Sequence, residues 1–349
     1  MNEEDVIDNK QQNKQEEEQK TFLFMQMAGL GDIIIASQAC QDIKRFYRNS
    51  KIIFVVPEGL KMAAEGIKEV DEIYEYDKFG KHKSFWGTLK FIFSIKHKGK
   101  IDYSFTTFDT DNSLWLAALL GAREKHTYPP VGFISNLPTF FNLVVHEKDS
   151  ETNTAEDLQN WVASIFKEFP FSKCLDFKYP DNVKTEIEKK LIAIKAANYP
   201  LIALCPCSKS SEKNWSPKEA AQFIELAYTD GRRIIFIGVE KDKWFIDEVK
   251  KLTQKPYFDL MGQTNIMEIG ALANRVQAFV SVESGAMHIA YACGAPTVCL
   301  FFSSQDFYKW APKEYANTAV LHRPEGISGE KCYEIIKDFL KQQANLQED

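Results

Sequence analysis

The sequence predicts an α/β protein with two doubly wound lobes, and three observations lead to that prediction. Its 349 residues are too many for one ordinary core and fit two domains of about 150 residues each. Short β-rich runs alternate with amphipathic helical patterns, which is typical of parallel sheets covered by helices on both faces. The same order of strand, turn and helix occurs in each half. We therefore expect functional groups at the carboxyl ends of the strands, along a central cleft between the lobes.

The bulk composition is that of a soluble globular protein, with 44% hydrophobic and 26% charged residues and a net charge of -6. Such a mildly acidic chain is a poor candidate for a general nucleic-acid binder. The first twenty residues are almost wholly polar, so we expect a disordered tail without a signal peptide. No run approaches the length of a membrane span, and a cytoplasmic location is expected. The seven cysteines form no paired zinc pattern and are expected to be reduced.

The first half contains a clear series of strand and helix patterns. The apolar run 21–27 predicts a strand, and the amphipathic run 32–48 predicts the helix after it. A second strand is expected at 51–56, a third at 101–108, and a helix at 112–122. The turn between the first strand and the first helix contains glycines and an acid.

The second half opens a new series with a buried strand at 200–206. A seam is expected around 170–182, where turn residues occur without periodicity. We place the domains at 21–175 and 176–349. The later elements are expected as helix 216–230, strand 232–238, helices 241–252 and 266–276, strand 278–282, helix 285–294 and strand 297–302.

The first turn, in "FMQMAGLGDIIIASQAC", carries Asp32 next to two glycines. Gly29 and Gly31 let the backbone approach a ligand, and the following helix start offers unpaired N–H groups. Asp is also a favoured residue at helix starts. Taken alone, the turn favours a helix cap over a catalytic acid.

Two loops in the second half could bind phosphate. In "VESGAMHIA", Glu283, Ser284 and Gly285 fall at a helix start, where backbone amides suit a diphosphate, and His288 lies one turn inside. A capped helix with an incidental histidine is an equal alternative. In "CPCSKSSEKNWSP", hydroxyl groups and the ammonium of Lys213 also suit phosphate, although a polar surface loop is the default for such a segment.

Together the three loops resemble glycosyltransferase family 9, the bacterial ADP-heptose:lipopolysaccharide heptosyltransferases. The matching stretches are "GLGDIIIASQA", "SKSSEKNWSP" and "VSVESGAMHIAYACGAPTVCLF", and the order agrees over roughly residues 21–310. The resemblance implies a GT-B fold of two Rossmann-like lobes, with acceptor bound by the first and nucleotide sugar by the second. It also implies inverting, metal-independent transfer of heptose from ADP-heptose as substrate, with no cofactor. The implied acceptor is a lipopolysaccharide core at the cytoplasmic face of the inner membrane.

The resemblance also implies roles for single residues. Asp32 falls on the catalytic base, and Lys213 on the lysine that meets the donor phosphates. Ser208 falls on a hydroxyl residue that binds phosphate, and Asp242 on an acid that binds the donor ribose. The late motif at the helix start falls on Glu283, Ser284, Gly285 and His288. In the first lobe, Gly31 belongs to the implied acceptor side.

Two departures from the family pattern concern the substrates. The family's D-T-G is E-S-G here, which leaves the identity of the donor open. Asn112 stands where relatives often have a lysine that faces the anionic acceptor. Two other functions therefore stay open, which are transfer to a protein side chain and non-catalytic binding of a nucleotide sugar or glycolipid.

The segment 78–100 could offset the missing lysine, because it has seven lysines and no acid. We expect Lys81, Lys83 and Lys90 to bind acceptor. Five aromatic residues are interleaved with the lysines, so the segment could also lie against an anionic membrane. The alternative is an amphipathic helix with solvated lysines and core-facing aromatics. The aromatic residues are Phe79, Phe85, Trp86, Phe91 and Phe93.

Overall fold

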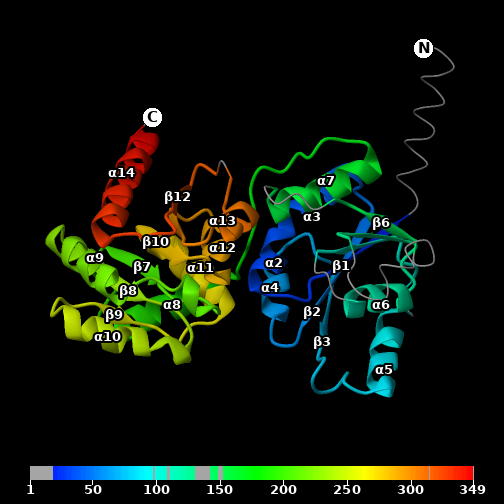
Figure 1. The fold of residues 1–349 in the computed structure, drawn as a ribbon, viewed down its shortest axis with the longest axis horizontal. Coiled ribbons are helices and arrows are strands. Elements are labelled where there is room, and N and C mark those ends of the chain that lie inside the picture. Colours follow the sequence, from blue (N-terminus) through cyan, green and yellow to red (C-terminus); the bar gives the residue numbers. More distant parts are fainter. Residues whose placement is uncertain are drawn as a thin grey trace, which may run out of the picture. The chain divides into compact units, whose positions relative to one another are not determined.

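The computed structural model describes residues 19–348 with five gaps, at 97–98, 108–110, 130–141, 148–151 and 314. The chain divides into two compact units, Met1–Lys173 and Cys174–Asp349. Each unit contains a six-stranded sheet in which every strand pair is parallel (Figure 1). None of the described helices combines the length and apolar character needed to cross a membrane.

Unit 1 has the strand order β3-β2-β1-β4-β5-β6, with helices on both faces of the sheet. On one face, α5 and α6 pack against β1 and β2 through an aliphatic cluster that includes Leu23, Ile53 and Ile92. On the other face, Phe22 contacts Phe166 of α7. The strands are β1 (Lys20–Met25), β2 (Ser50–Pro57), β3 (Glu72–Tyr76), β4 (Tyr103–Thr106), β5 (Glu124–Thr127) and β6 (Leu143–Val145). The helices are α2 (Leu30–Ile35), α3 (Ser37–Phe46), α4 (Lys61–Glu65), α5 (Phe85–Lys96), α6 (Asp111–Leu119) and α7 (Thr154–Phe166).

Unit 2 has the order β12-β11-β10-β7-β8-β9 and two buried clusters, one on each face of its sheet. Helices α9, α10 and α14 cover one face, and α8 and α11 cover the other. The strands are β7 (Leu201–Cys205), β8 (Arg233–Phe236), β9 (Phe258–Asp259), β10 (Ala278–Val282), β11 (Thr297–Phe301) and β12 (Thr318–His322). The helices are α8 (Asp181–Ala193), α9 (Pro217–Thr229), α10 (Trp244–Leu252), α11 (Ile266–Arg275), α12 (Gly285–Ala292), α13 (Ser304–Trp310) and α14 (Gly329–Glu348).

The sheets confirm the predicted α/β class, and most predicted strands and helices occur within a few residues of their expected bounds. The continuous helix predicted over 32–48 is wrong, because it is interrupted at Ala36 between α2 and α3. Three buried β-branched residues, Ile33, Ile34 and Ile35, precede the interruption. Such side chains restrict χ1 and crowd the preceding turn of a helix. The interruption makes α2 a separate short helix that directly follows the glycine turn.

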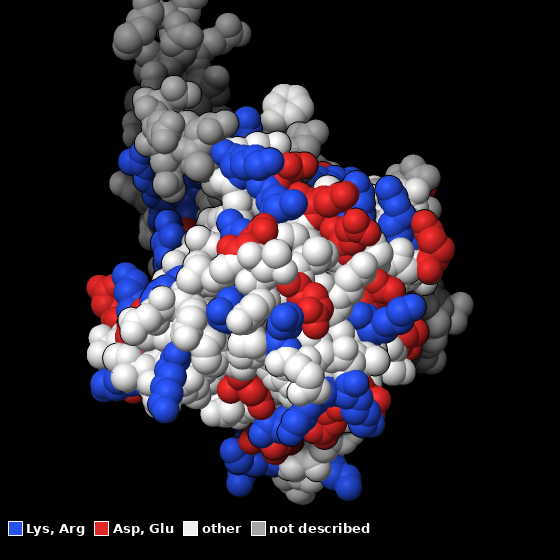
Figure 2. All heavy atoms as spheres, turned by 90° about the vertical axis from the view of Figure 1, so that its left-hand side faces the viewer, with Lys and Arg blue, Asp and Glu red and all other residues white. Residues whose placement is uncertain are grey.

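The side of the molecule in Figure 2 belongs to unit 2, where α9, α10 and α14 lie. Lysine and arginine side chains alternate there with aspartate and glutamate side chains. On these helices, ion pairs form between residues of the same helix, such as Lys251 with Glu248 on α10. Mixed charge of this kind is the ordinary surface of a globular domain.

Candidate active site

The turns after three neighbouring strands of unit 2 bring an ammonium group and two carboxylates together. Lys213 ends the short 3-10 helix η2 (Ser211–Lys213) after β7, Glu283 follows β10, and Asp306 lies in the first turn of α13 after β11. Strands β7, β10 and β11 are adjacent in the sheet. The Nζ of Lys213 lies 2.6 Å from Oε2 of Glu283 and 2.9 Å from Oδ1 of Asp306. Two predicted donor-site residues, Lys213 and Glu283, are thus in contact.

The electrostatics of this triad favour a charged lysine. Burial lowers the pKa of Lys213, but hydrogen bonds to Asp306 and Glu283 raise it, and the net shift is upward. Burial raises the pKa of Glu283, and this effect exceeds the opposing effect of the Lys213 ammonium. Burying the Glu283 carboxylate is costly even beside the Lys213 ammonium. The ammonium stays charged, so it can exchange this carboxylate for an incoming anion.

The start of helix α12 provides backbone donors next to this triad. Ser284 is the N-cap, and its Oγ accepts a hydrogen bond of 3.4 Å from the N–H of Met287. The same oxygen lies 3.0 Å from Oγ of Ser281. Gly285 is the first helical residue, as the sequence predicts. The first N–H groups of a helix have no partner within the helix and carry partial positive charge, so this end of α12 suits an anion.

His288 lies on the buried side of α12, with 1% of its surface exposed. Its Nδ1 is 2.6 Å from the hydroxyl of Tyr291, and its ring packs against Tyr291 and Trp310. Burial lowers the pKa of His288 to about 3, so the imidazole is neutral and shares a hydrogen bond with the tyrosine hydroxyl. The structure encloses this side chain, and its predicted contact with donor stays a prediction.

Two other predicted donor residues shape loops at strand ends. The backbone N–H of Ser208 donates to Oδ1 of Asn214 at 2.8 Å, which closes the loop after β7. Asp242 is buried at the end of the 3-10 helix η3 (Glu240–Asp242), where its Oδ2 accepts from the N–H of Val239 at 3.4 Å. Gly238 before it has φ of +154°, a conformation that side chains rarely adopt. The ribose contact of Asp242 remains a prediction.

In unit 1, Asp32 takes part in the helix start that the local sequence favours. It is the third residue of α2, and its Oδ2 accepts a hydrogen bond of 3.0 Å from the N–H of Gly29. This bond holds the half-buried carboxylate at the carboxyl end of β1. Such a position is where parallel sheets place catalytic groups.

The residues predicted to bind acceptor also lie in unit 1. Lys81, Lys83 and Lys90 are exposed, and Lys81 Nζ lies 3.4 Å from Oε1 of Glu58. Gly31 is the second residue of α2. Asn112 falls in α6, but its side chain lies outside the described residues.

The sequence reasoning overlooked Asp306. The sequence does carry a signal for Asp306, because this acid follows the predicted strand 297–302. That strand is the neighbour of the strand that ends before Glu283. The described residues contain no group of three or more histidine, cysteine and acidic side chains placed to hold a metal ion. The metal-free reaction stays a prediction.

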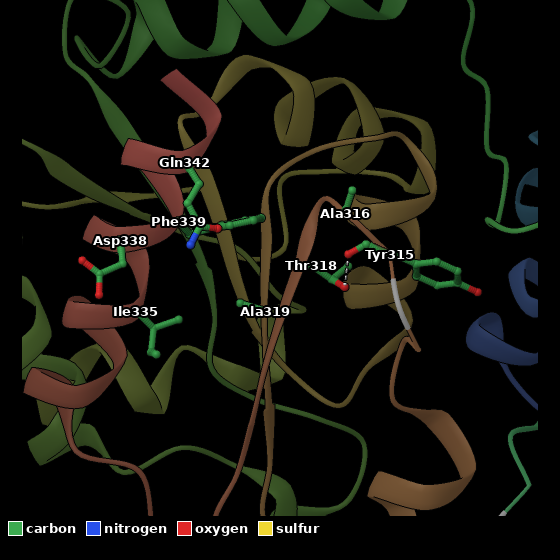
Figure 3. Close-up of a pocket in the computed structure, with 8 residues that line it drawn as sticks. All are labelled: Tyr315, Ala316, Thr318, Ala319, Ile335, Asp338, Phe339 and Gln342. Atoms are coloured by element: carbon green, nitrogen blue, oxygen red, sulfur yellow. Dashed lines mark hydrogen bonds between the residues drawn. The ribbon is translucent and has the colours of Figure 1, made fainter. Parts of the chain in front are cut away.

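A cavity of about 530 Å³ lies elsewhere in unit 2, where β12 and the loop before it face α14 (Figure 3). It contains none of the predicted site residues. Phe339 and Gln342 of α14 form one wall, and Thr318 of β12 belongs to the other. The candidate site is therefore defined by its charged triad and helix start, and this cavity is separate from it.

Comparison with known proteins decides the family. The model of glycosyltransferase family 9 (heptosyltransferase) matches residues 134–333, more than half of the chain. The chain belongs to glycosyltransferase family 9. This membership makes it a glycosyltransferase and confirms the resemblance that its three loops carry.

Two heptosyltransferases are similar to this chain over most of their length. The chain is 22% identical to the lipopolysaccharide core heptosyltransferase OpsX of Haemophilus influenzae, over 81% of the chain and 79% of the relative. It is 24% identical to lipooligosaccharide heptosyltransferase 2 of Haemophilus ducreyi, with 79% and 80% covered.

Solved structures of family 9 confirm the GT-B-like fold. A family 9 glycosyl transferase from Veillonella parvula superposes with a TM-score of 0.82 at 19% identity, covering 93% of this chain and 98% of that one. The ADP-heptose lps heptosyltransferase II of Escherichia coli gives a TM-score of 0.75 at 17% identity, with 93% and 99% covered.

Proposed function

We propose that this protein is an inverting, metal-independent heptosyltransferase that moves heptose from ADP-heptose to a lipopolysaccharide core acceptor. The observation that carries the proposal is the contact of Lys213 with Glu283 and Asp306 beside the start of α12. Relatives named as heptosyltransferases of lipopolysaccharide support the substrate class. A solved heptosyltransferase WaaC of Escherichia coli contains ADP, and this chain superposes on it with a TM-score of 0.72 at 14% identity.

The donor's diphosphate would take the place of a carboxylate as partner of Lys213. Negative charge builds on the diphosphate as the sugar leaves, and fixed donors stabilise that charge most in the transition state. Lys213 supplies an ammonium, and the first amides of α12 supply hydrogen bonds and the positive end of the helix dipole. Neutralisation of the leaving group by the protein itself is the reason that we propose metal independence.

Asp32 is the proposed general base. A sugar hydroxyl is a weak nucleophile at neutral pH and needs a carboxylate to accept its proton. In the proposed step, the acceptor oxygen bonds to the anomeric carbon while that carbon's bond to the diphosphate oxygen breaks. The electron pair leaves on ADP, and the acceptor's proton passes to Asp32. Attack opposite the leaving group inverts the anomeric configuration.

The acceptor's anionic groups would meet lysines of unit 1. Lys83 and Lys90 are exposed, and neither has a carboxylate within salt-bridge distance among the described residues. An ammonium on a flexible stem suits phosphate as a point charge. We propose that these lysines and Lys81 hold a phosphorylated core saccharide.

A donor screen tests the proposal. ADP-heptose should raise the melting temperature of the wild type more than UDP-, GDP- or CMP-sugars do. Lys213→Met should weaken ADP-heptose binding by about tenfold or more, because a charge-assisted contact with phosphate is lost. Lys209→Met is the matched control, since Lys209 is an exposed lysine of the same loop. Equal affinity of all three proteins would contradict the donor site.

The stereochemistry and the metal requirement need a second experiment. The anomeric configuration of the product, measured by NMR, should be opposite to that of the donor. Turnover should continue at an unchanged rate after dialysis against a chelator. A retained configuration or a rate restored only by a divalent cation would contradict the proposed mechanism.

A further inference from the structure

We propose that α5 and the loop before it dock onto a lipid bilayer with anionic headgroups. The docking surface consists of four exposed aromatic residues and the lysines around them. We call it the α5 surface, and its aromatic members are Phe79, Phe85, Trp86 and Phe93. It lies within unit 1, where α5 is drawn in cyan in Figure 1. Docking goes beyond the proposed sugar transfer and is tested without it, although Lys83 and Lys90 are the lysines also proposed to hold the acceptor.

The aromatic residues of this surface are far more exposed than such side chains ordinarily are. Phe79 is 85% exposed, Phe85 71%, Trp86 72% and Phe93 65%. Exposing apolar side chains of this size to water is unfavourable, and several of them close together in sequence mark an interaction site. The core of unit 1 does not need them.

Helix α5 reaches that core with a different face. Phe91, Ile92 and Ile95 are buried and join the cluster that holds α5 on the sheet. Trp86 and Phe93 are seven positions apart, so they share one side of the helix with Lys90 between them. The expectation that the aromatic residues face the core is therefore met only by Phe91. Trp86 and Phe93 instead form an outward apolar stripe beside Lys90.

The loop before α5 is held rigidly, although Phe79 stands out from it. Oδ1 of Asp77 accepts from the N–H of Gly80 at 2.7 Å, and Oδ2 accepts from the N–H of Lys81 at 2.6 Å. The ring of His82 stacks on Tyr76 at 5.2 Å. A Cβ at Gly80 would lie 2.1 Å from the Asp77 carboxylate, so a larger residue there would displace the carboxylate that closes the turn. A preorganised loop loses little entropy when Phe79 enters an interface.

The charge of the surface identifies its partner. Lys83, Lys90 and Lys96 are exposed and have no carboxylate within salt-bridge distance among the described residues. Residues 78–100 contain no acid, although the chain as a whole carries a net charge of -6. An uncompensated cluster of lysines attracts an anionic surface.

The arrangement of the rings favours a bilayer over a nucleic acid. Bases stack on parallel aromatic faces, whereas Phe85 and Trp86 meet edge to face at 73°. Phenylalanine and tryptophan rings that point outward between lysines are typical of proteins that insert into the headgroup boundary. The lysine ammonium groups can then extend to the lipid phosphates.

Co-sedimentation of the full-length protein with vesicles tests docking. The wild type should bind vesicles of phosphatidylglycerol and phosphatidylcholine, and should bind pure phosphatidylcholine far more weakly. A triple variant with Lys83, Lys90 and Lys96 changed to glutamine should lose on the order of 100-fold in partition coefficient at low salt. A second triple variant, with Phe79, Trp86 and Phe93 changed to serine, should lose about tenfold or more.

Matched controls separate this surface from general effects. Phe169→Ser removes an equally exposed phenylalanine of unit 1, at 89% exposure, and should bind as the wild type does. Changing Lys250, Lys331 and Lys337 of unit 2 to glutamine removes the same charge elsewhere and should also have little effect. Equal melting temperatures of all variants would show that folding is intact.

Insertion of Trp86 gives an independent measurement. Vesicles with brominated acyl chains should quench part of the tryptophan fluorescence, and Trp86→Phe should abolish that part while it still binds. Three results would overturn the proposal: wild type that does not bind anionic vesicles, aromatic variants that bind undiminished, or a Trp86 that is not quenched. If the lysine variant loses vesicle binding and the aromatic variant does not, the surface is an electrostatic site for another polyanion such as a nucleic acid.

Discussion

At the scale of single residues, Lys213 is the residue that joins the two carboxylates of the candidate donor site. Its ammonium holds Glu283 and Asp306 at 2.6 and 2.9 Å, and both carboxylates are largely shielded from solvent. Removing one member of a shielded charge group costs more than the group contributes, because the remaining charges lose their counter-ion. The triad is therefore a structural element as well as a candidate binding site.

We predict that Lys213→Met lowers the free energy of unfolding by about 1–3 kcal/mol near pH 8. Without the lysine, the already raised pKa of Glu283 rises further, so the folded state binds protons more readily than the unfolded state. The loss of unfolding free energy should be full above the pKa of Glu283 in the variant, and it should shrink as the pH falls through that pKa. Urea denaturation near pH 8 and near pH 5 measures the difference. A loss that is independent of pH would contradict this view of the triad.

His288 makes a second prediction at this scale. Its pKa in the folded protein is about 3, against about 6.5 when unfolded, so protonation favours the unfolded chain. The penalty is absent above pH 6.5 and grows as the pH falls toward 3. His288→Asn, whose amide can still hydrogen-bond to Tyr291 without titrating, should remove about 2 kcal/mol of the stability difference between pH 7 and pH 5. Equal pH dependence of the two proteins would show that His288 is more accessible than the structure indicates.

At the scale of elements, one buried carboxylate on α3 holds the last part of unit 1 together. Asp42 is fully buried and accepts hydrogen bonds from the N–H groups of Phe171 and Ser172, at 3.1 and 2.8 Å. It also accepts from the Nε2 of Gln159 on α7, at 2.7 Å. Burial raises the pKa of Asp42, and these donors oppose that shift.

We predict that Asp42→Ala lowers the free energy of unfolding by about 3 kcal/mol or more, because two backbone N–H groups lose their acceptor and the Nε2 of Gln159 loses one of its two. Asp181→Ala is the control. Its carboxylate pairs with Lys184 at an exposed helix start, and the change should be under about 0.5 kcal/mol. Equal losses in chemical denaturation would contradict the role assigned to Asp42.

Central strands and their helices could be predicted from the sequence, whereas β5, the strand next to the edge strand β6, could not. β1, β7 and β10 are apolar runs, because both faces of these strands are covered. β5 reads Glu-Lys-His-Thr and looks like a polar turn. Its Lys125 is buried, with Nζ donating to the carbonyl of Ala122, which only the surrounding fold makes possible. The interruption at Ala36 is likewise a packing effect that a periodic pattern cannot show.

The candidate site could be predicted in part. Lys213 and Glu283 are 70 residues apart, and their contact follows once both are placed at the ends of adjacent parallel strands. The enclosed position of His288 could not be predicted, because helical periodicity does not tell how deep a small-residue helix is buried. The exposure of Phe79 and Trp86 could not be predicted either, since aromatic residues beside lysines occur on core-facing as well as on outward faces.

At the scale of the whole molecule, each unit has its own sheet and its own buried clusters. All proposed donor contacts belong to unit 2, so we predict that Cys174–Asp349 expressed alone folds cooperatively. It should bind ADP within about tenfold of the affinity of the full chain. Calorimetry of the fragment and the full chain measures this. A folded fragment that does not bind ADP would place essential nucleotide contacts in unit 1.

The central claim is that this chain transfers heptose with Asp32 as the base. The most direct test is the initial rate of ADP release from saturating ADP-heptose with a lipopolysaccharide core acceptor, for the wild type and Asp32→Asn. The asparagine oxygen can still accept from the N–H of Gly29, so the fold and donor binding should be kept. We predict a rate about 10²–10⁴-fold lower for Asp32→Asn at unchanged donor affinity. Equal rates of the two proteins would contradict the account.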